Sequence, residues 1–465
     1  MPLAFPLGLL LSVLFGILAW LLPAAKVMAA VVAIAAIITI IRRPLWGLLL
    51  FAFIATFLPY TTVTIGFRTT VSEAVLMLVW ASVMAQHLFG QMQQAPKMLP
   101  TERRMVALML FSALPFLVGQ VIINADGNGP INWVRWLFNL SALFLVPRLL
   151  DTPQKREQLV TGLLLGTLFL LLLSIPIYFK DRTSATITDV LGKLGYGSID
   201  LVTKTLAGFS TRMTSPWNHP NITGGAMALL VPLAACFGLT RRGWPRALGV
   251  AVTLLGMLGL VLTGSRGALI SLLLVMVWLV SKRVAYVGRV LMVALVGAAL
   301  LLMFYPPLQD RVADLFSSND ASTSVRFDEY ASFPEAMASY PLGIGFKVDP
   351  PVPNTDLLGI SNLYLNYVYK LGVLGLLMFL AVVRSWWLYT RPTTRTITLT
   401  HDNALWLGST IGVLAALVSG LFDHYFSFTM VLIAVFWLLM GLNLHEAKRL
   451  RAIPGSTLAN TGNRS

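Results

Sequence analysis

The stretch VLTGSRGALISLLL, from Val261 to Leu274, decides how the fold is interpreted. It places an arginine, Arg266, in a short polar turn between two apolar segments that have the composition of membrane helices. An arginine at bilayer depth costs roughly 2.5–3.5 kcal/mol on insertion scales. The chain therefore needs either a turn that brings Arg266 to a membrane surface or a partner for its charge.

Apolar segments like these recur along almost the whole chain. Of its 465 residues, 57% are hydrophobic and 11% are charged, and the mean hydropathy is +0.78. A charged fraction of about 25% is usual for soluble domains. We therefore predict an all-α protein: a polytopic transmembrane helical bundle of about 12–14 spans, in a single membrane domain covering residues 1–465.

The predicted spans differ in length, and several fall short of the ~20 residues that a full crossing needs. Leu45–Leu58 and Ala268–Val280 are the weakest, so the lower count is about twelve. The apolar runs are Phe5–Leu22, Val27–Ile41, Leu45–Leu58, Ala74–Phe89, Met105–Ile123, Trp133–Leu150, Leu159–Phe179, Gly224–Leu239, Ala247–Leu262, Ala268–Val280, Val290–Tyr305, Leu363–Val383, Ala404–Phe422 and Phe426–Leu442.

The basic residues lie mostly in alternate loops between these runs. The net charge of +15 therefore follows the positive-inside rule and does not indicate nucleic-acid binding. The rule places both termini in the cytoplasm, including a short tail at residues 452–465. Phe5–Leu22 has no basic segment before it and no clear cleavage site, so we expect it to be retained as a span. The single cysteine, Cys236, excludes an intramolecular disulfide.

Two long loops, residues 180–223 and 306–362, then face outward. In the second, LQDRVADLF (308–316) gathers apolar side chains on one helical face. In the first, DVLGKLGYGSIDLVTKTL (189–206) shows a broken amphipathic pattern. We expect both loops to be partly helical and to lie on the membrane surface over the bundle. Solvent-exposed linkers are the alternative.

The segment Ala247–Val280 explains where Arg266 lies. A single helix over these 34 residues would be about 51 Å long, well beyond the ~30 Å hydrocarbon core. The segment must therefore fold back, and Gly264 and Gly267 permit a tight turn. This places Arg266 at the outer interface, where its planar fork of donors suits phosphate oxygens. Snorkelling, or pairing with a carboxylate such as Asp423, would equally satisfy the arginine.

Other groups capable of chemistry collect on the same outward side. They are Arg212 and His219 in one loop, Arg326, Asp328, Glu329 and Lys347 in the other, and Asp423 and His424 in a tight turn. These loops carry no D-x-D, H-E-x-x-H or paired histidines, so we predict no metal site. The adjacent carboxylates of RFDEY point in different directions on a helix. No G-x-S-x-G hydrolase motif is suitably placed.

Five stretches in order resemble the O-antigen ligase and polymerase superfamily of bacterial envelopes. They are RMTSPWNHPNITGG (212–225), LTGSRGALISLLL (262–274), YPLGIGF (340–346), SNLYLNYVYKLGVLGLL (361–377) and FDHYF (422–426). The resemblance covers roughly Phe209 to Leu442, whereas the N-terminal half matches only as a hydrophobic profile.

The resemblance implies a GT-C-like bundle in the bacterial inner membrane whose outward loops are periplasmic. It implies transfer of a glycan from an undecaprenyl-diphosphate-linked donor to an acceptor glycan or lipid, with inversion and without nucleotide sugar, metal or other cofactor. Arg212 and Arg266 match the family's arginines that hold the donor diphosphate. Such arginines would stabilise the leaving group as its charge develops.

One position departs from the family pattern. Ligases carry a histidine, proposed to act on the acceptor hydroxyl, where this chain has Ser361. Serine cannot serve as a general base at neutral pH, so His424, Asp423 and His219 become the candidate catalytic residues. A polymerase-type member is the other explanation. Candidate substrate contacts are Arg326, Lys347, Asn362, Tyr364 and Arg68.

A lipid-linked glycan flippase or another membrane transporter is the competing function. A transporter is expected to place polar residues along a path within its spans. Here the ionisable residues gather at one surface, with Arg135 and Lys370 as the nearest exceptions. This distribution favours an enzyme that works at the surface. Trp217, Tyr364 and Tyr367 could stack on sugar rings, although aromatic residues at membrane interfaces need no such role.

Overall fold

The apolar segments around Arg266 form two helices in the computed structural model. The structure describes residues 24–65, 67–91, 96–124, 126–181, 185–197, 199–207, 212–304, 321–347, 360–428, 430–453 and 458. Helix α13 spans Trp244–Thr263 and helix α14 spans Arg266–Ser281. Gly264 ends α13 in the left-handed conformation, with φ of 59°. The predicted turn between Gly264 and Gly267 is therefore confirmed.

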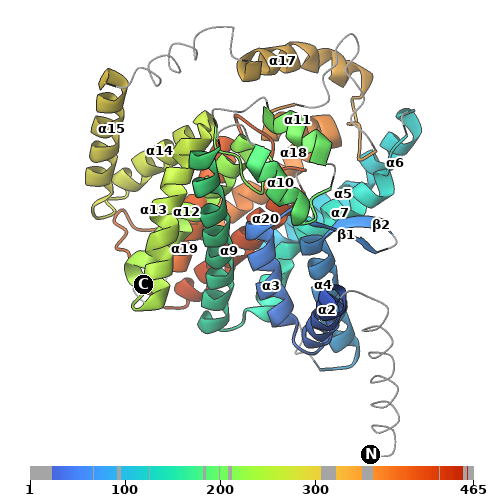
Figure 1. Cartoon of the computed structure of the whole chain (residues 1–465), viewed down its shortest axis with the longest axis horizontal. Helices are drawn as coiled ribbons and strands as arrows, with labels where there is room; N and C mark the ends of the chain where they lie inside the picture. Colours follow the sequence, from blue (N-terminus) through green and yellow to red (C-terminus); the bar gives the residue numbers. More distant parts are fainter. Residues whose placement is uncertain are drawn as a thin grey trace, which may run out of the picture.

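The other elements are nearly all helical (Figure 1). A two-stranded antiparallel sheet, β1 (Thr62–Ile65) and β2 (Phe67–Thr70), pairs Thr64 with Arg68. The helices are α2 (Ala24–Arg42), α3 (Pro44–Phe57), α4 (Val71–Leu88), α5 (Pro100–Phe111), α6 (Ala113–Ile122), α7 (Gly129–Ser141), η1 (Ala142–Leu145), α8 (Val146–Leu149), α9 (Pro153–Lys180), α10 (Ala185–Lys193), α11 (Ile199–Ala207), α12 (Pro220–Thr240), α15 (Val287–Phe304), α17 (Ala321–Ser339), α18 (Leu363–Thr390), α19 (Ala404–Ser419) and α20 (Met430–Arg451).

The all-α, polytopic class predicted from hydropathy is confirmed. Among the described residues, 7 helices are long and apolar enough to cross a membrane: Val71–Leu88, Pro100–Ile122, Pro153–Lys180, Pro220–Thr240, Trp244–Thr263, Leu363–Thr390 and Val431–Arg451. Shorter apolar helices add Val31–Arg42, Pro44–Phe57, Arg266–Ser281, Val287–Gly297 and Ala404–Ser419. The predicted first span, Phe5–Leu22, lies outside the described residues. The protein is a multi-pass membrane protein.

Three of the predicted runs are not continuous helices. Met105–Ile123 is divided at Ser112 between α5 and α6. Trp133–Leu150 is divided among α7, η1 and α8. Helix α18 breaks at Gly372, where φ is 71°. The backbone of the loop segment 343–345 packs against this break. The amide of Gly345 donates to the carbonyl of Lys370 at 3.0 Å. Hydropathy does not report such breaks, because both halves remain apolar.

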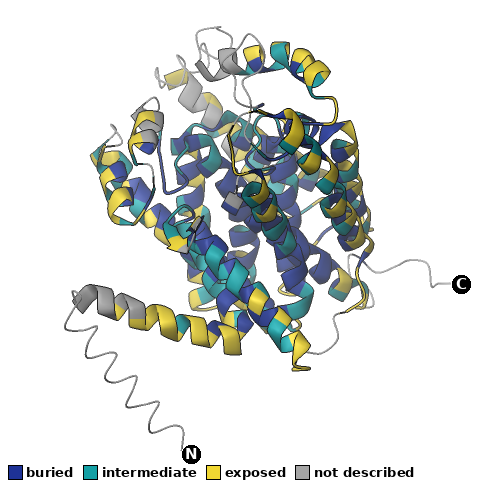
Figure 2. Ribbon diagram, turned by 90° about the vertical axis from the view of Figure 1, so that its right-hand side faces the viewer, coloured by how far each residue is buried: buried dark blue, intermediate teal, exposed yellow. Residues whose placement is uncertain are grey.

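Helices α12 and α20 are the most deeply buried of the candidate spans in the described part of the chain. The dark blue residues in Figure 2 mark the buried interior of the bundle. Glycines allow the neighbours of α12 to approach closely. A Cβ on Gly249 of α13 would lie 2.6 Å from Cα of Gly238, and a Cβ on Gly412 of α19 would lie 2.2 Å from the carbonyl oxygen of Leu229. The close packing of α13 and α19 on α12 fixes where the hairpin turn sits.

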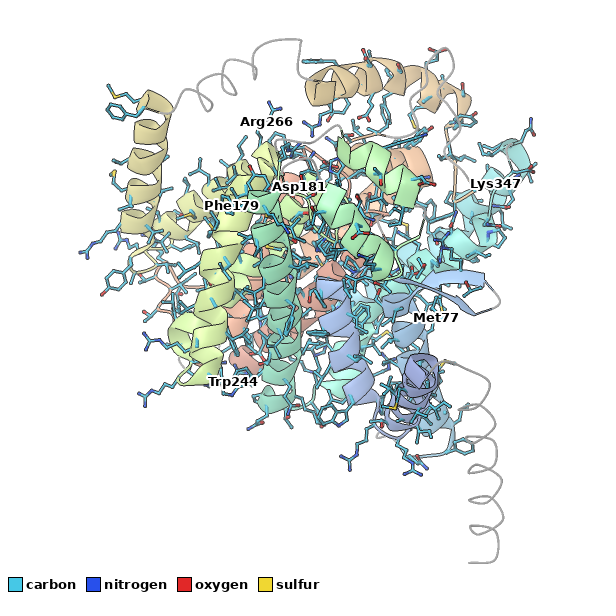
Figure 3. The ribbon with its side chains drawn as sticks, in the orientation of Figure 1. Met77, Phe179, Asp181, Trp244, Arg266 and Lys347 are labelled. Atoms are coloured by element: carbon cyan, nitrogen blue, oxygen red, sulfur yellow. The ribbon has the colours of Figure 1, made fainter. Side chains whose placement is uncertain are left out.

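The helices from the two long predicted loops lie at the same end of the bundle as Arg266 (Figures 1 and 3). Helices α10 and α11 come from residues 180–223, and α17 comes from residues 306–362, so both loops are partly helical as expected. The amphipathic stretch 308–316 lies outside the described residues. We call this end of the bundle, where α12 and α14 begin, the cavity end.

Candidate functional site

The turn at Gly264–Gly267 is packed against two other segments at the cavity end. A Cβ on Gly224, in the first turns of α12, would lie 2.4 Å from Cβ of Ser265. A Cβ on Gly267 would lie 2.7 Å from Cβ of Phe422, in the turn after α19. The FDHYF turn and the start of α12 are therefore held directly against the arginine-bearing turn. Three stretches that resemble one family are brought together in this way.

These segments enclose a cavity with an empty volume of about 310 Å³, part of it open to solvent. The residues that line the cavity come from five separate parts of the chain: Arg212, Asn221, Gly264, Ser265, Arg266, Gly267, Arg326, Phe422, Asp423 and Tyr425. The two predicted diphosphate-binding arginines, Arg212 and Arg266, thus line one cavity, and Arg326 and Asp423 join them.

Hydrogen bonds fix the orientation of Arg212 in this cavity. Its Nε donates to the carbonyl of Thr263 at 2.7 Å, and its Nη2 donates to Oδ1 of Asn221. The other side of the Asn221 amide donates to Oδ2 of Asp423 at 3.2 Å. Arg326 approaches the same carboxylate oxygen at 3.9 Å. A chain of polar contacts therefore links two of the three arginines through Asn221 and Asp423.

The described residues that line the cavity carry three guanidinium groups and one carboxylate. The buried Nε of Arg326 has no hydrogen-bond acceptor within the described parts of the chain. Burial raises the pKa of Tyr425, whose hydroxyl also interacts with Ser265 and Ser419, so the phenol stays neutral. The described wall is thus positive overall, and guanidinium groups are suited to binding an anion such as a phosphate.

His219 is used as the N-cap of α12. Its Nδ1 accepts a hydrogen bond from the backbone amide of Asn221 at 3.1 Å. Burial lowers the pKa of His219 to about 4, and Arg212 adds to this shift although Asp423 opposes it. The imidazole is therefore neutral near pH 7, with its proton on Nε2 because Nδ1 accepts.

Asp423 and His424 lie side by side in the turn after α19. The backbone amide of His424 donates to Oδ1 of Asp423 at 2.9 Å. The ring Nδ1 of His424 lies 3.5 Å from the same oxygen, and that buried nitrogen has no hydrogen-bond partner in the described structure. Since 39% of the His424 side chain is exposed, its ring is less constrained than that of His219.

Glu329 was noted in the second long loop but was not among the catalytic or substrate-binding residues predicted from the sequence. In the structure it lies on α17 and is 8% exposed. Its two carboxylate oxygens accept from the amide and from the hydroxyl of Ser361, at 2.7 and 3.0 Å. Burial raises the pKa of Glu329, although the bonds from Ser361 oppose this. A buried carboxyl group in a loop otherwise rich in polar residues was not visible from the sequence pattern.

The remaining predicted substrate contacts are not among the residues that line the cavity. Lys347 donates to the carbonyl of Ile123 at 2.8 Å and lies well to one side of Arg266 (Figure 3). Asn362 caps α18, and the hydroxyl of Tyr364 donates to the carbonyl of Leu417 at 2.8 Å. Arg68 lies on β2, and its carbonyl accepts from Arg135. Their roles toward a substrate stay predictions.

The fold and the cavity define a class before any comparison: a multi-pass membrane protein with an arginine-lined cavity at one end of its bundle. Residues 250–380 match the family model described as O-Antigen ligase. This match over part of the chain bears out the resemblance to the O-antigen ligase and polymerase superfamily that its motifs indicate. The match includes Arg266, Arg326 and Ser361, whereas Arg212 and Asp423 lie outside it. No curated protein matches the chain.

The family match supports a glycosyltransferase-type enzyme that acts in the formation of envelope polysaccharide. It also fits a membrane protein with lipid-linked glycans as substrates. Within the described ranges, no group of three or more histidine, cysteine, aspartate or glutamate side chains could hold a metal ion.

Proposed function

We propose that the protein transfers a glycan from an undecaprenyl-diphosphate-linked donor to an acceptor glycan or lipid at the periplasmic face of the bacterial inner membrane. The observation that carries this proposal is the cavity lined by Arg212, Arg266 and Arg326 at the end of an apolar hairpin. A diphosphate attached to a polyprenyl chain has an anionic group at the membrane surface and an apolar tail in the bilayer.

The arginines would act on the leaving group. When the bond between the sugar's anomeric carbon and the diphosphate breaks, negative charge develops on the diphosphate oxygens. Prearranged guanidinium groups stabilise this charge more in the transition state than in the ground state. Arg212 is already held by Thr263 and Asn221, so little reorganisation is needed when the donor binds. The guanidinium groups would supply the charge that a metal ion supplies in other transferases.

The competing function is that of a flippase or another transporter. One of the two charges that could have lined its path is engaged within the protein. Arg135 was, with Lys370, one of the two nearest candidates for a charge along a path within the spans. In the structure it lies 3.5 Å from the buried carboxylate of Glu73, and its Nη2 donates to the carbonyl of Arg68. Glu73 also completes the capping box of α4 with Thr70. These contacts give Arg135 a structural role.

The test is a transfer assay with purified protein, an undecaprenyl-diphosphate-linked oligosaccharide and candidate acceptors. Replacing Arg266 with alanine should reduce transfer at least ~100-fold, because losing one such donor costs about that much. Arg266→Lys should also fail, since an ammonium group cannot make the planar two-pronged contact. Arg242→Ala, at the exposed start of the loop after α12, is the matched control and should retain full activity.

Two further readouts of the same assay refine the proposal. If the product stays on polyprenyl diphosphate, the enzyme is a polymerase; if the glycan moves to another carrier, it is a ligase. A chelator should leave the rate unchanged, and inhibition by a chelator would contradict the metal-free mechanism. Full transfer by Arg266→Ala would show that the cavity is not the donor site.

A further inference from the structure

The proposed transfer leaves one proton to be placed. When an acceptor hydroxyl attacks the anomeric carbon, a C–O bond forms, the bond to the diphosphate breaks, and the hydroxyl proton must leave. The leaving electron pair goes to the diphosphate among the arginines. A group that accepts the proton must therefore lie beside the cavity and must not already be protonated or committed.

His219 does not meet this requirement. Its Nδ1 lone pair accepts the amide hydrogen of Asn221 at 3.1 Å. In the neutral ring the other nitrogen carries the proton, so neither nitrogen offers a lone pair to an acceptor hydroxyl. The helix cap would have to break before His219 could act as a base.

Asp423 is less suitable because both of its carboxylate oxygens already have partners in the protein. Oδ1 accepts from the amide of His424 at 2.9 Å, Oδ2 accepts from Asn221 at 3.2 Å, and Arg326 lies 3.9 Å from Oδ2. Both carboxylate oxygens of Asp423 are therefore already used by neighbouring groups of the protein, one of them a cation. The structure gives Asp423 a positioning role for the arginines.

His424 is nearer to a suitable geometry, but among the described residues no hydrogen bond orients its ring. Its Nδ1 is 3.5 Å from Asp423, beyond an ordinary nitrogen–oxygen hydrogen bond, and the aspartate oxygen is already bound to the amide of the same residue. A histidine base normally has its second nitrogen held by such a bond, which fixes the tautomer.

Glu329 combines orientation with basicity. Its two oxygens are held by the amide and hydroxyl of Ser361 at 2.7 and 3.0 Å. Since a carboxylate has about four lone-pair sites, these two bonds leave room for an acceptor hydroxyl. Glu329 lies three residues after Arg326, which lines the cavity, so the two side chains are neighbours on α17. Asp423 and His424 lie close enough to Glu329 to influence its ionisation.

We propose that Glu329 accepts the proton of the acceptor hydroxyl, with Ser361 as the residue that positions its carboxylate. The inference rests on the proposed function and names the group that activates the acceptor. The acceptor oxygen forms the new bond to the anomeric carbon, its proton moves to Glu329, and the diphosphate departs with the electron pair of the broken bond. The proton then passes to solvent before the next turnover.

The test compares Glu329→Gln with Asp328→Asn in the purified transfer assay. Glutamine keeps the shape of glutamate but cannot take up a proton, so transfer should fall ~100-fold or more. Binding of undecaprenyl diphosphate should change less than about twofold, since the arginines remain. Asp328→Asn removes the same charge from the neighbouring, exposed position on α17 and should retain full activity. His424→Gln should lose less than ~10-fold.

The pH profile distinguishes a base from a structural residue. Burial and Asp423 raise the pKa of Glu329, while the Ser361 bonds and His424 lower it, with a net rise. The wild-type rate should therefore increase with pH through a midpoint above the usual glutamate range. Ser361→Ala removes a bond to the ionised form and should move this midpoint upward. In Glu329→Gln this rising limb should disappear.

Transfer within about threefold of wild type by Glu329→Gln would overturn the inference. Loss of diphosphate binding in parallel with transfer would also overturn it, because Glu329 would then shape the donor site. Neither result would affect the proposed function. That function fails separately if the wild-type protein transfers no glycan from the lipid-linked donor.

Discussion

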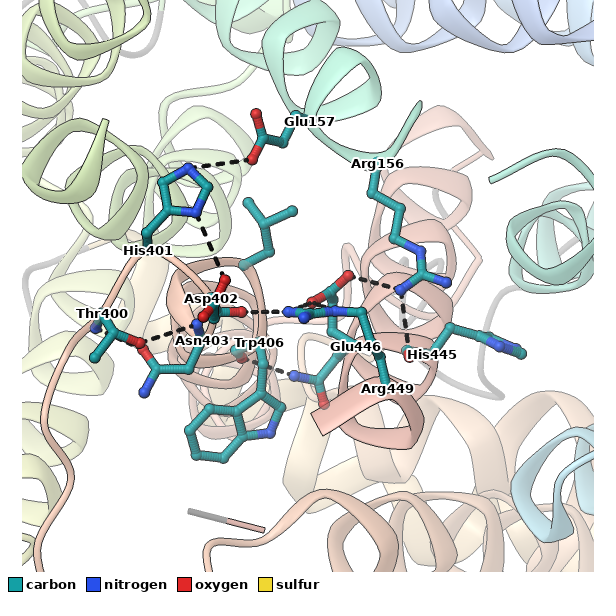
Figure 4. A network of polar contacts seen from close by, with 12 residues as sticks. Arg156, Glu157, Thr400, His401, Asp402, Asn403, Trp406, His445, Glu446 and Arg449 are labelled. Atoms are coloured by element: carbon teal, nitrogen blue, oxygen red, sulfur yellow. Dashed lines mark hydrogen bonds and ion pairs between the residues drawn. The ribbon is translucent and has the colours of Figure 1, made fainter. Parts of the chain in front are cut away.

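Two clusters of charged side chains lie at opposite ends of α12, and they differ in the proportion of basic to acidic groups. At the end where α12 finishes, Arg156, Arg241 and Arg449 each have a carboxylate oxygen within 2.8 Å, as Figure 4 illustrates for Arg156 and Arg449. At the cavity end, the described lining has three arginines and a single carboxylate, Asp423.

The balanced cluster joins helix ends to one another. Glu446 on α20 binds Arg156 at the start of α9, and His445 binds Glu102 at the start of α5 at 2.9 Å. Desolvated charges are stable only when they are paired, so this cluster is consistent with a structural role. The excess of positive charge at the cavity end is instead what an anionic substrate would neutralise. The two clusters therefore differ as groups that hold the bundle together differ from groups that we propose to act on a ligand.

The largest effect is expected on breaking the balanced cluster. Glu446→Ala leaves Arg156 buried without its partner and should lower the free energy of unfolding by about 3–5 kcal/mol. Thermal unfolding of the purified protein measures this. Asp151→Asn is the matched control at the same end, because its ion pair with Lys155 is exposed and worth at most about 1 kcal/mol. Equal stability of the two variants would contradict the structural assignment.

The next largest effect is expected at the cavity end, on a substitution that makes the cavity wall more positive. Asp423→Asn removes the one described carboxylate in the cavity wall and releases Arg326 and Asn221 from it. Transfer should fall ~10-fold because the arginines are misplaced. The inhibition constant of undecaprenyl diphosphate should stay equal or decrease, since the wall becomes more positive. Weaker inhibition by the diphosphate would show that the aspartate does not act through charge.

The smallest effect is expected at His219. Asparagine is also a good N-cap, so His219→Asn should keep transfer within about twofold of wild type. The lowered pKa of His219, about 4, means that the folded protein binds its proton less readily than the unfolded chain. Wild-type stability should therefore decline as the pH falls from about 6.5 toward 4, and less so in the variant. A loss of transfer of ~100-fold would make His219 catalytic.

The sequence was sufficient for the membrane class and for the turn around Arg266. The hydropathy pattern indicates the lengths of the apolar segments, and the glycines around Arg266 indicate a turn. The breaks at Ser112 and Gly372 were not predictable, because a helix that changes direction inside the membrane stays apolar. The break at Gly372 lies against Gly343, about thirty residues earlier in the chain. A Cβ placed on Gly343 would lie 2.6 Å from the amide nitrogen of Gly372.

The charged residues that line the cavity could be predicted from the sequence, because their charge alone made them candidates. Arg212, Arg266, Arg326 and Asp423 were all selected from the sequence, and the structure brings them to one cavity. Asn221 was missed because an asparagine after a proline at a helix start is ordinary. Glu329 was missed because its importance depends on burial and on Ser361, a contact between residues thirty-two positions apart. Lys347 and Asn362 were selected for their chemistry, but in the structure their side chains bind backbone carbonyls.

Above all, we propose that the cavity binds the diphosphate of a lipid-linked glycan. The most direct measurement is the affinity of purified protein for undecaprenyl diphosphate and for undecaprenyl monophosphate, in wild type, Arg266→Ala and Arg242→Ala. We expect the wild type and Arg242→Ala to prefer the diphosphate at least ~10-fold, and Arg266→Ala to lose that preference. Equal affinity of all three proteins for the diphosphate would contradict the account.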